Sequence, residues 1–250
     1  VRPDGRVVAV AAAMVLFYTA GMFLNDLCDY ALDVRQRPER PLPSGVVGRG
    51  EAWGGVVLLF GAGLALLAPL GTAPVAAGLA LVATIAVYDL WHKTNPASPL
   101  LMAACRALVY VTAALAVAPP VTGEVLLWAG LLFGYVVGLT AIAKTEAGER
   151  LGGYLPAALV VLPGVIFAAS EPPAAAWPLL AAFLAWVAYG ASFVYRAERR
   201  SIGRAVGSLI AGISLLDALV LAVAGSGVGV ALAFVAFAAT LYLQRHIAGT

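Results

Sequence analysis

Three aspartates are spaced so that a helix would carry all of them on one face: Asp26, Asp29 and Asp33 stand at i, i+3 and i+7. Carboxylates gathered in this way repel one another, and a bound cation relieves the repulsion. Hard oxygen ligands with an incomplete shell suit Mg²⁺, which usually keeps waters and binds substrate phosphates. Arg37 and Arg40 follow within a turn or two and supply the positive charge that a diphosphate leaving group requires. The segment therefore predicts a magnesium-diphosphate site, and the simpler alternative is a charged helix end that reaches into water.

The composition of the 250-residue chain indicates a membrane protein. Hydrophobic residues make up 62% of the sequence and charged residues 11%, whereas a soluble domain carries about 25% charged residues. A soluble fold of this size could not cover its surface with so few charges, but in lipid an apolar outer surface is expected. The net charge is only +2, and no basic run with interleaved aromatics is present, so nucleic acid is not an expected partner.

Nine apolar segments are long enough, with a few added loop residues, to cross a bilayer as helices. They are Val7–Leu27, Trp53–Leu70, Ala73–Tyr88, Leu100–Val117, Val125–Ala143, Tyr154–Ala169, Trp177–Tyr195, Ala205–Ala224 and Val228–Leu243. Their many small residues allow helices to approach closely in lipid. We therefore predict an all-α, polytopic membrane helix bundle of about nine transmembrane helices, which forms a single domain over residues 1–250.

The basic residues support this segmentation and orient it. Twelve of the fifteen Lys and Arg residues fall on alternate connections or after the last span, namely Arg35, Arg37, Arg40, Arg49, Lys93, Lys144, Arg150, Arg196, Arg199, Arg200, Arg204 and Arg245. The positive-inside rule makes this side cytoplasmic. The acidic motifs are thus predicted on the cytoplasmic face of a multi-pass protein, in the cell membrane of a bacterium or archaeon.

The first motif resembles that of the UbiA family of membrane prenyltransferases. Asn25 precedes the aspartates to give N-D-x-x-D-x-x-x-D, and residues 40–45 read R-P-L-P-S-G, as in that family. Tyr88 to Asn95 extends the resemblance. It implies a UbiA-like bundle with a lipid-open cavity, in which a polyprenyl diphosphate ionises with Mg²⁺ as cofactor and an aromatic or other lipophilic acceptor captures the allylic cation. Donor, acceptor and membrane lipid are the implied partners, and no protein partner can be inferred.

The resemblance also implies roles for single residues. Asp26, Asp29 and Asp33 would bind Mg²⁺ and the diphosphate with Asn25 in support, while Arg37, Arg40 and Lys93 would stabilise the leaving diphosphate.

Arg106 lies inside a predicted span, where ionisable residues are rare and usually functional. It is a candidate for binding the diphosphate or an acceptor carboxylate. A pair with Asp89 or with a backbone carbonyl is the structural alternative.

The family's second motif is another aspartate-rich cluster on a later cytoplasmic connection, and residues 144–150 occupy the matching place. Here the segment holds Glu146 and Glu149 and no aspartate. The two glutamates could bind a second Mg²⁺ with altered geometry, or pair with the neighbouring Lys144 and Arg150. Two functions stay open: a Mg²⁺-dependent prenyltransferase, and a non-catalytic UbiA-like protein that binds an isoprenoid or lipid or assists export. A secondary transporter is a weaker third, because no internal repeat or pair of broken helices is visible.

Two further features bear on the placement within the family. The segment Cys105–Tyr110 and the glutamates of the second motif are similar to UbiA-like proteins of the EboC type. In the family the first motif ends the second helix, whereas here it ends the first predicted span. This difference predicts that the chain lacks the family's first helix.

Overall fold

The computed structural model describes residues 4–91, 95–145, 153–196 and 200–246. Over these residues the chain is all-α and contains no strand, as predicted. The helices are α1 Gly5–Gln36, α2 Arg49–Leu67, α3 Thr72–Trp91, α4 Ser98–Val117, α5 Gly123–Lys144, α6 Leu155–Ala169, α7 Trp177–Tyr195, α8 Ile202–Val223 and α9 Gly227–His246. Short 3-10 turns, η1 Ala68–Leu70 and η3 Ala174–Ala176, follow α2 and precede α7.

The helices have the length and composition of membrane spans. Eight of those in the described ranges are long and apolar enough to cross a bilayer, and α6 is shorter, at 15 residues. Large apolar side chains such as Val57, Leu58 and Val235 are exposed, which is expected where the surrounding solvent is hydrocarbon. The chain is therefore an integral membrane protein.

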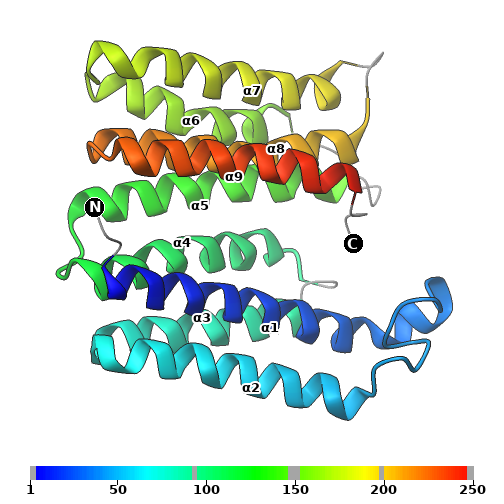
Figure 1. The fold of residues 1–250 in the computed structure, drawn as a ribbon. Helices are drawn as coiled ribbons and strands as arrows, with labels where there is room; N and C mark the ends of the chain where they lie inside the picture. Colours follow the sequence, from blue (N-terminus) through cyan, green and yellow to red (C-terminus); the bar gives the residue numbers. More distant parts are fainter. Residues whose placement is uncertain (1–3, 92–94, 146–152, 197–199, 247–250) are drawn as a thin grey trace. The chain divides into compact units, whose positions relative to one another are not determined.

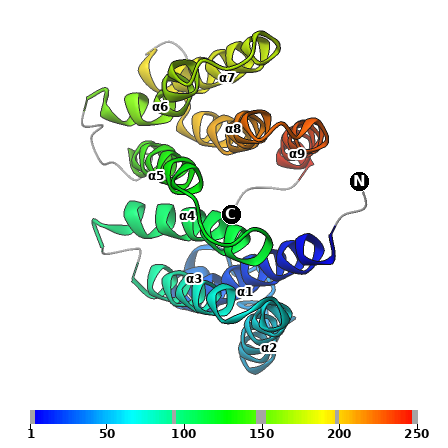
Figure 2. The ribbon, with the colours of Figure 1, turned by 90° about the vertical axis from the view of Figure 1, so that its left-hand side faces the viewer.

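The helices group into two compact units, residues 1–129 and residues 130–250. In the first unit α1 packs along α2 and α3 along α4, and α1 also contacts α3 and α4. Figure 1 shows these four helices running back and forth, so that α1 and α3 end at the same end of the unit, and Figure 2 shows the same helices nearly end-on. In the second unit α8 packs against both α7 and α9, and α6 against α7. The single domain over residues 1–250 stays a prediction.

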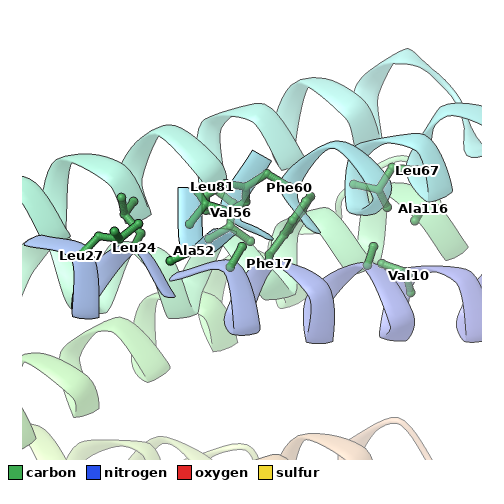
Figure 3. Close-up of a cluster of buried hydrophobic side chains, with 12 residues drawn as sticks. Val10, Phe17, Leu24, Leu27, Ala52, Val56, Phe60, Leu67, Leu81 and Ala116 are labelled. Carbon is green, nitrogen blue, oxygen red and sulfur yellow. The ribbon is translucent and has the colours of Figure 1, made fainter. Parts of the chain in front are cut away.

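The core of the first unit lies where α1 crosses α2 and α3. Phe17 is 1% exposed, and its ring centroid is 6.1 Å from that of Phe60. Figure 3 shows both side chains within the buried cluster. Gly63 of α2 faces the Phe17 ring, which a Cβ at this position would overlap, whereas a Cβ at Gly61 would meet open space. Small residues thus let these helices approach closely, which holds helices together in a bilayer, and the contact fixes α1 against its neighbours.

The core of the second unit contains a polar contact between helices. Tyr135 of α5 is fully buried, and its hydroxyl donates to the Leu209 carbonyl of α8 at 2.8 Å. Trp186 of α7 donates its indole N–H to the Ser208 carbonyl at 2.7 Å. A Cβ at Gly212 would lie 2.5 Å from the Tyr135 hydroxyl. A glycine at that point therefore leaves the room that the tyrosine needs.

Candidate active site

The aspartate motif lies on the last turns of α1. The helix begins after Asp4, whose carboxylate caps it by accepting from the Arg6 backbone N–H at 3.2 Å. It then runs past the apolar segment and through the whole motif to Gln36. Because the motif is helical, Asp26 and Asp33 lie along one face, as their spacing predicts.

The surroundings of these two carboxylates differ. The Asp26 side chain is 43% exposed, while that of Asp33 is 7% exposed. Arg40 lies against both: its Nη1 donates to Asp33 Oδ2 at 2.8 Å and lies 3.7 Å from Asp26 Oδ1. The structure thus joins two of the predicted metal ligands to one of the predicted diphosphate-binding arginines.

The connection between α1 and α2 returns Arg40 to α1 through a series of backbone hydrogen bonds. The N–H of Arg40 donates to the carbonyl of Arg37 at 3.1 Å, and the N–H of Ser44 donates to the carbonyl of Arg40 at 2.9 Å. At the start of α2, the Glu51 carboxylate accepts from the Gly48 N–H at 2.8 Å. These bonds turn the chain back on itself, so that a residue beyond the end of α1 reaches its last turns.

Asn25, the first residue of the motif, has its partner on another helix. Its Nδ2 donates to Asp89 Oδ1 of α3 at 3.2 Å, and Asp89 is only 6% exposed. Asp29 Oδ1 and Asp89 Oδ2 are both enclosed by the protein. Tyr88 lies close enough to both aspartates to interact with them electrostatically. A group of polar side chains from α1 and α3 therefore lies beside the exposed Asp26.

Asp89 is not among the site residues that the sequence predicts. A pair of Asp89 with Arg106 was the alternative left open, whereas in the structure Asp89 accepts a hydrogen bond from Asn25. The signal available in the sequence was an ionisable residue near the end of an apolar span, which is rare and usually functional. Which side chain it would meet depends on how α1 packs against α3.

The other two predicted arginines, Arg37 and Arg106, lie on different parts of the chain. Arg37 is exposed and follows directly after α1, where its backbone N–H donates to the Asp33 carbonyl at 2.8 Å. Arg106 of α4 is exposed within its unit, and its guanidinium carbon lies 5.8 Å from the ring centroid of Tyr18. The cation therefore faces an aromatic ring. Its predicted role in binding the diphosphate or an acceptor stays a prediction.

Three predicted site residues, Lys93, Glu146 and Glu149, lie outside the described residues. Thr145 is the last described residue after α5, and its hydroxyl donates to the Ile142 carbonyl at 2.7 Å. The roles assigned to these three residues therefore stay predictions.

Mg²⁺ is the cofactor that the resemblance implies, and the charges of the site allow a test of its fit. Asp26 and Asp33 already share a cation, the guanidinium of Arg40. Among the described residues, no three His, Cys, Asp or Glu side chains are close enough together to hold a metal ion. Mg²⁺ commonly binds through only one or two carboxylates and completes its shell with water and phosphate oxygens. The residues therefore fit Mg²⁺ that arrives together with a diphosphate.

The fold and the site together define the class: an all-helical integral membrane protein with carboxylates and arginines at the end of one helix. Comparison with known proteins identifies the family. Residues 2–154 match the model of the UbiA prenyltransferase family. The match covers more than half of the chain, which therefore belongs to this family. No comparison tests the placement in the EboC-type subgroup, which stays a prediction.

The similar curated relatives are archaeal enzymes. A digeranylgeranylglyceryl phosphate synthase of Methanoregula boonei is 41% identical over 92 residues, which are 36% of this chain and 32% of that relative. The synthase of the same name from Sulfolobus acidocaldarius is 36% identical over 74 residues, 30% of this chain and 26% of the relative. The chain thus spans about a third or less of the length of the curated relatives it matches.

The fold also has a counterpart among solved structures. A structure from work on digeranylgeranylglyceryl phosphate synthase in membranes matches with a TM-score of 0.63 and 17% identity. The match covers 88% of this chain and 85% of the other. At this identity the likeness shows the fold alone, and it supports the UbiA-like helical architecture.

Proposed function

We propose that the chain is a membrane prenyltransferase that moves a prenyl group from a polyprenyl diphosphate to a lipophilic acceptor, with Mg²⁺ as cofactor. The observation that carries the proposal is the contact of Arg40 with Asp26 and Asp33 at the end of a membrane-spanning helix. The two carboxylates can bind a metal cation, and the arginine beside them suits phosphate. Together they form a site for a diphosphate that carries a bound cation. The donor is amphipathic, so its tail belongs in hydrocarbon and its head at such a helix end.

In the proposed reaction the bond between the allylic carbon and the diphosphate oxygen breaks, and both electrons leave with the diphosphate. An acceptor atom then forms a new bond to that carbon and loses its proton to solvent. Arg40 and Arg37 would bind the negative charge that develops on the leaving group. Among Asp26, Asp29 and Asp33, one or two carboxylates would hold Mg²⁺ together with diphosphate oxygens, and the metal would supply further neutralisation of that charge. Lys93, Glu146 and Glu149 are proposed to complete the site.

The relatives suggest which substrates to test first. Their name, digeranylgeranylglyceryl phosphate synthase, points to a geranylgeranyl donor and a glyceryl phosphate acceptor. A glyceryl phosphate lipid satisfies the requirement for a lipophilic acceptor as well as an aromatic compound does. We therefore propose geranylgeranyl diphosphate as the first donor, with glyceryl phosphate and aromatic acceptors compared side by side, and with the site on the cytoplasmic face.

The test is diphosphate release by the purified chain in nanodiscs, with Mg²⁺ and a panel of prenyl diphosphates and acceptors. We expect release that depends on the acceptor and that Asp29→Ala abolishes. Glu124→Gln serves as a control, because Glu124 is an exposed acid at the start of α5, outside the motif. Tight donor binding without release would instead support the non-catalytic isoprenoid-binding protein. If no donor binds, both functions are wrong.

A further inference from the structure

We propose that Asp89 is a positioning residue, which holds the Asn25 side chain so that its amide oxygen, and not its amide nitrogen, faces the bound metal and diphosphate. The inference rests on the proposed function and deepens it. It starts from the hydrogen bond in which Asn25 Nδ2 donates to Asp89 Oδ1 at 3.2 Å, between α1 and α3.

The chemistry of the two groups fixes the orientation of the amide. A side-chain amide has a donating nitrogen and an accepting oxygen, whereas an ionised carboxylate only accepts hydrogen bonds. In the structure Asp89 accepts from the nitrogen of Asn25. Because the two ends of the planar amide point in different directions, the oxygen is turned away from Asp89. A reversed amide would present N–H groups, which cannot bind a cation.

The burial of Asp89 supports a role beyond packing. The residue is 6% exposed and lies on the last turn of α3, a membrane-spanning helix. Burying a carboxylate is unfavourable unless hydrogen bonds compensate for it, and ionisable groups within membrane spans are usually functional. Residues that orient metal ligands in this way typically change metal affinity by about 10- to 100-fold when they are replaced.

Two exchanges of side chain separate positioning from packing. Asp89→Asn puts two amides in contact, so the Asn25 amide is no longer held in one orientation. Asn25→Asp puts two carboxylates in contact, which repel each other. The double variant restores a pair of one amide and one carboxylate with the donor reversed: the amide at position 89 donates to the carboxylate at position 25, whose second oxygen faces the metal.

The experiment measures Mn²⁺ binding by electron paramagnetic resonance, with each variant in nanodiscs of neutral lipid and with geranylgeranyl S-thiolodiphosphate as the unreactive donor analogue. Empty nanodiscs correct for Mn²⁺ held by the analogue alone, and Glu124→Gln is the matched control. We expect Asp89→Asn to weaken Mn²⁺ binding by about tenfold or more. The double variant is expected to bind several-fold more tightly than Asp89→Asn, and the thermal transition of each variant reports its folding.

The outcomes distinguish the inference from the function on which it rests. If Asp89→Asn binds Mn²⁺ as tightly as the wild type, or if the double variant binds no better than folded Asp89→Asn, the inference is wrong and the proposed function stands. If the wild type itself does not bind Mn²⁺ with the analogue, both are wrong. The double variant keeps the test decisive if Asp89→Asn does not fold, because the double variant has a complete amide-carboxylate pair. Mn²⁺ binding like that of the wild type then supports the inference. Loss of Mn²⁺ binding in a folded double variant overturns it.

Discussion

Replacing Arg40 by Gln is expected to move two affinities in opposite directions. In the free protein the Arg40 guanidinium neutralises Asp33 and lies near Asp26. A metal ion that binds these carboxylates competes with it, whereas a diphosphate attracts it. Arg40→Gln should therefore strengthen the binding of Mn²⁺ alone and weaken the binding of the diphosphate.

The magnitude follows from the two contacts. The hydrogen bond from Arg40 to Asp33, at 2.8 Å with the Asp33 side chain 7% exposed, joins two charged groups and is worth about 1.5–3 kcal/mol. The Asp26 contact is 3.7 Å long and its side chain is 43% exposed, so it adds at most about 1 kcal/mol. Since 1.4 kcal/mol corresponds to about tenfold, we expect Mn²⁺ alone to bind about 10- to 100-fold more tightly after the substitution.

The diphosphate affinity should change less than the loss of a charged hydrogen bond to phosphate would suggest. Wild-type Arg40 gives up its contact with Asp33 when it turns to the diphosphate, so only the difference between the two interactions is gained. We expect a loss of a few-fold to about tenfold in Arg40→Gln.

Both affinities can be measured on one sample series. Mn²⁺ is titrated by electron paramagnetic resonance without a diphosphate, and geranylgeranyl S-thiolodiphosphate is then titrated at saturating Mn²⁺ by calorimetry. Arg245→Gln, which removes an exposed cation from the last turn of α9, is the control for net charge. If Arg40→Gln weakens both affinities, or changes neither, the reasoning that Arg40 competes with the metal is refuted.

Three further predictions concern packing and the cofactor. Gly63→Ala forces α2 away from the phenylalanine ring that it faces and should destabilise the protein by about 1–3 kcal/mol. Gly61→Ala, in open space, should be neutral or slightly stabilising. Thermal unfolding in nanodiscs compares the pair, and equal effects of the two substitutions would contradict the packing. Gly212→Ala places a methyl group against the buried tyrosine hydroxyl of α5 and should lower the transition temperature, unlike Gly130→Ala, which meets nothing within 4 Å; an unchanged transition in both would argue against the hydrogen bond between α5 and α8. Removal of divalent cations with EDTA should abolish diphosphate release, and added Mg²⁺ should restore it; release that persists in EDTA would exclude a required metal.

The helices were predictable because lipid requires long apolar segments whatever the tertiary structure. The segment predicted as Tyr154–Ala169 forms α6, Leu155–Ala169, almost residue for residue. The prediction Trp53–Leu70 began one turn late, because α2 starts at Arg49 with charged and small residues that hydropathy does not detect. The first predicted span likewise ended at Leu27, although the helix continues to Gln36.

The site was predictable only where local spacing decides it. The shared face of Asp26 and Asp33 follows from the helix repeat. Their contact with Arg40 depends on hydrogen bonds in the connection to α2 that no spacing rule gives. The pair of Asn25 and Asp89 joins residues 64 positions apart, so it depends on how α1 packs against α3, which hydropathy does not encode.

The most direct test of the proposed function is a product measurement. The wild-type chain in nanodiscs is incubated with Mg²⁺, geranylgeranyl diphosphate and a glyceryl phosphate or aromatic acceptor, and both diphosphate and prenylated acceptor are quantified by mass spectrometry. We predict one prenylated product per diphosphate released, lost in Asp29→Ala and retained in Glu124→Gln. Diphosphate release without a prenylated acceptor, or equal product from Asp29→Ala, would contradict a prenyl transfer that uses the aspartates of α1.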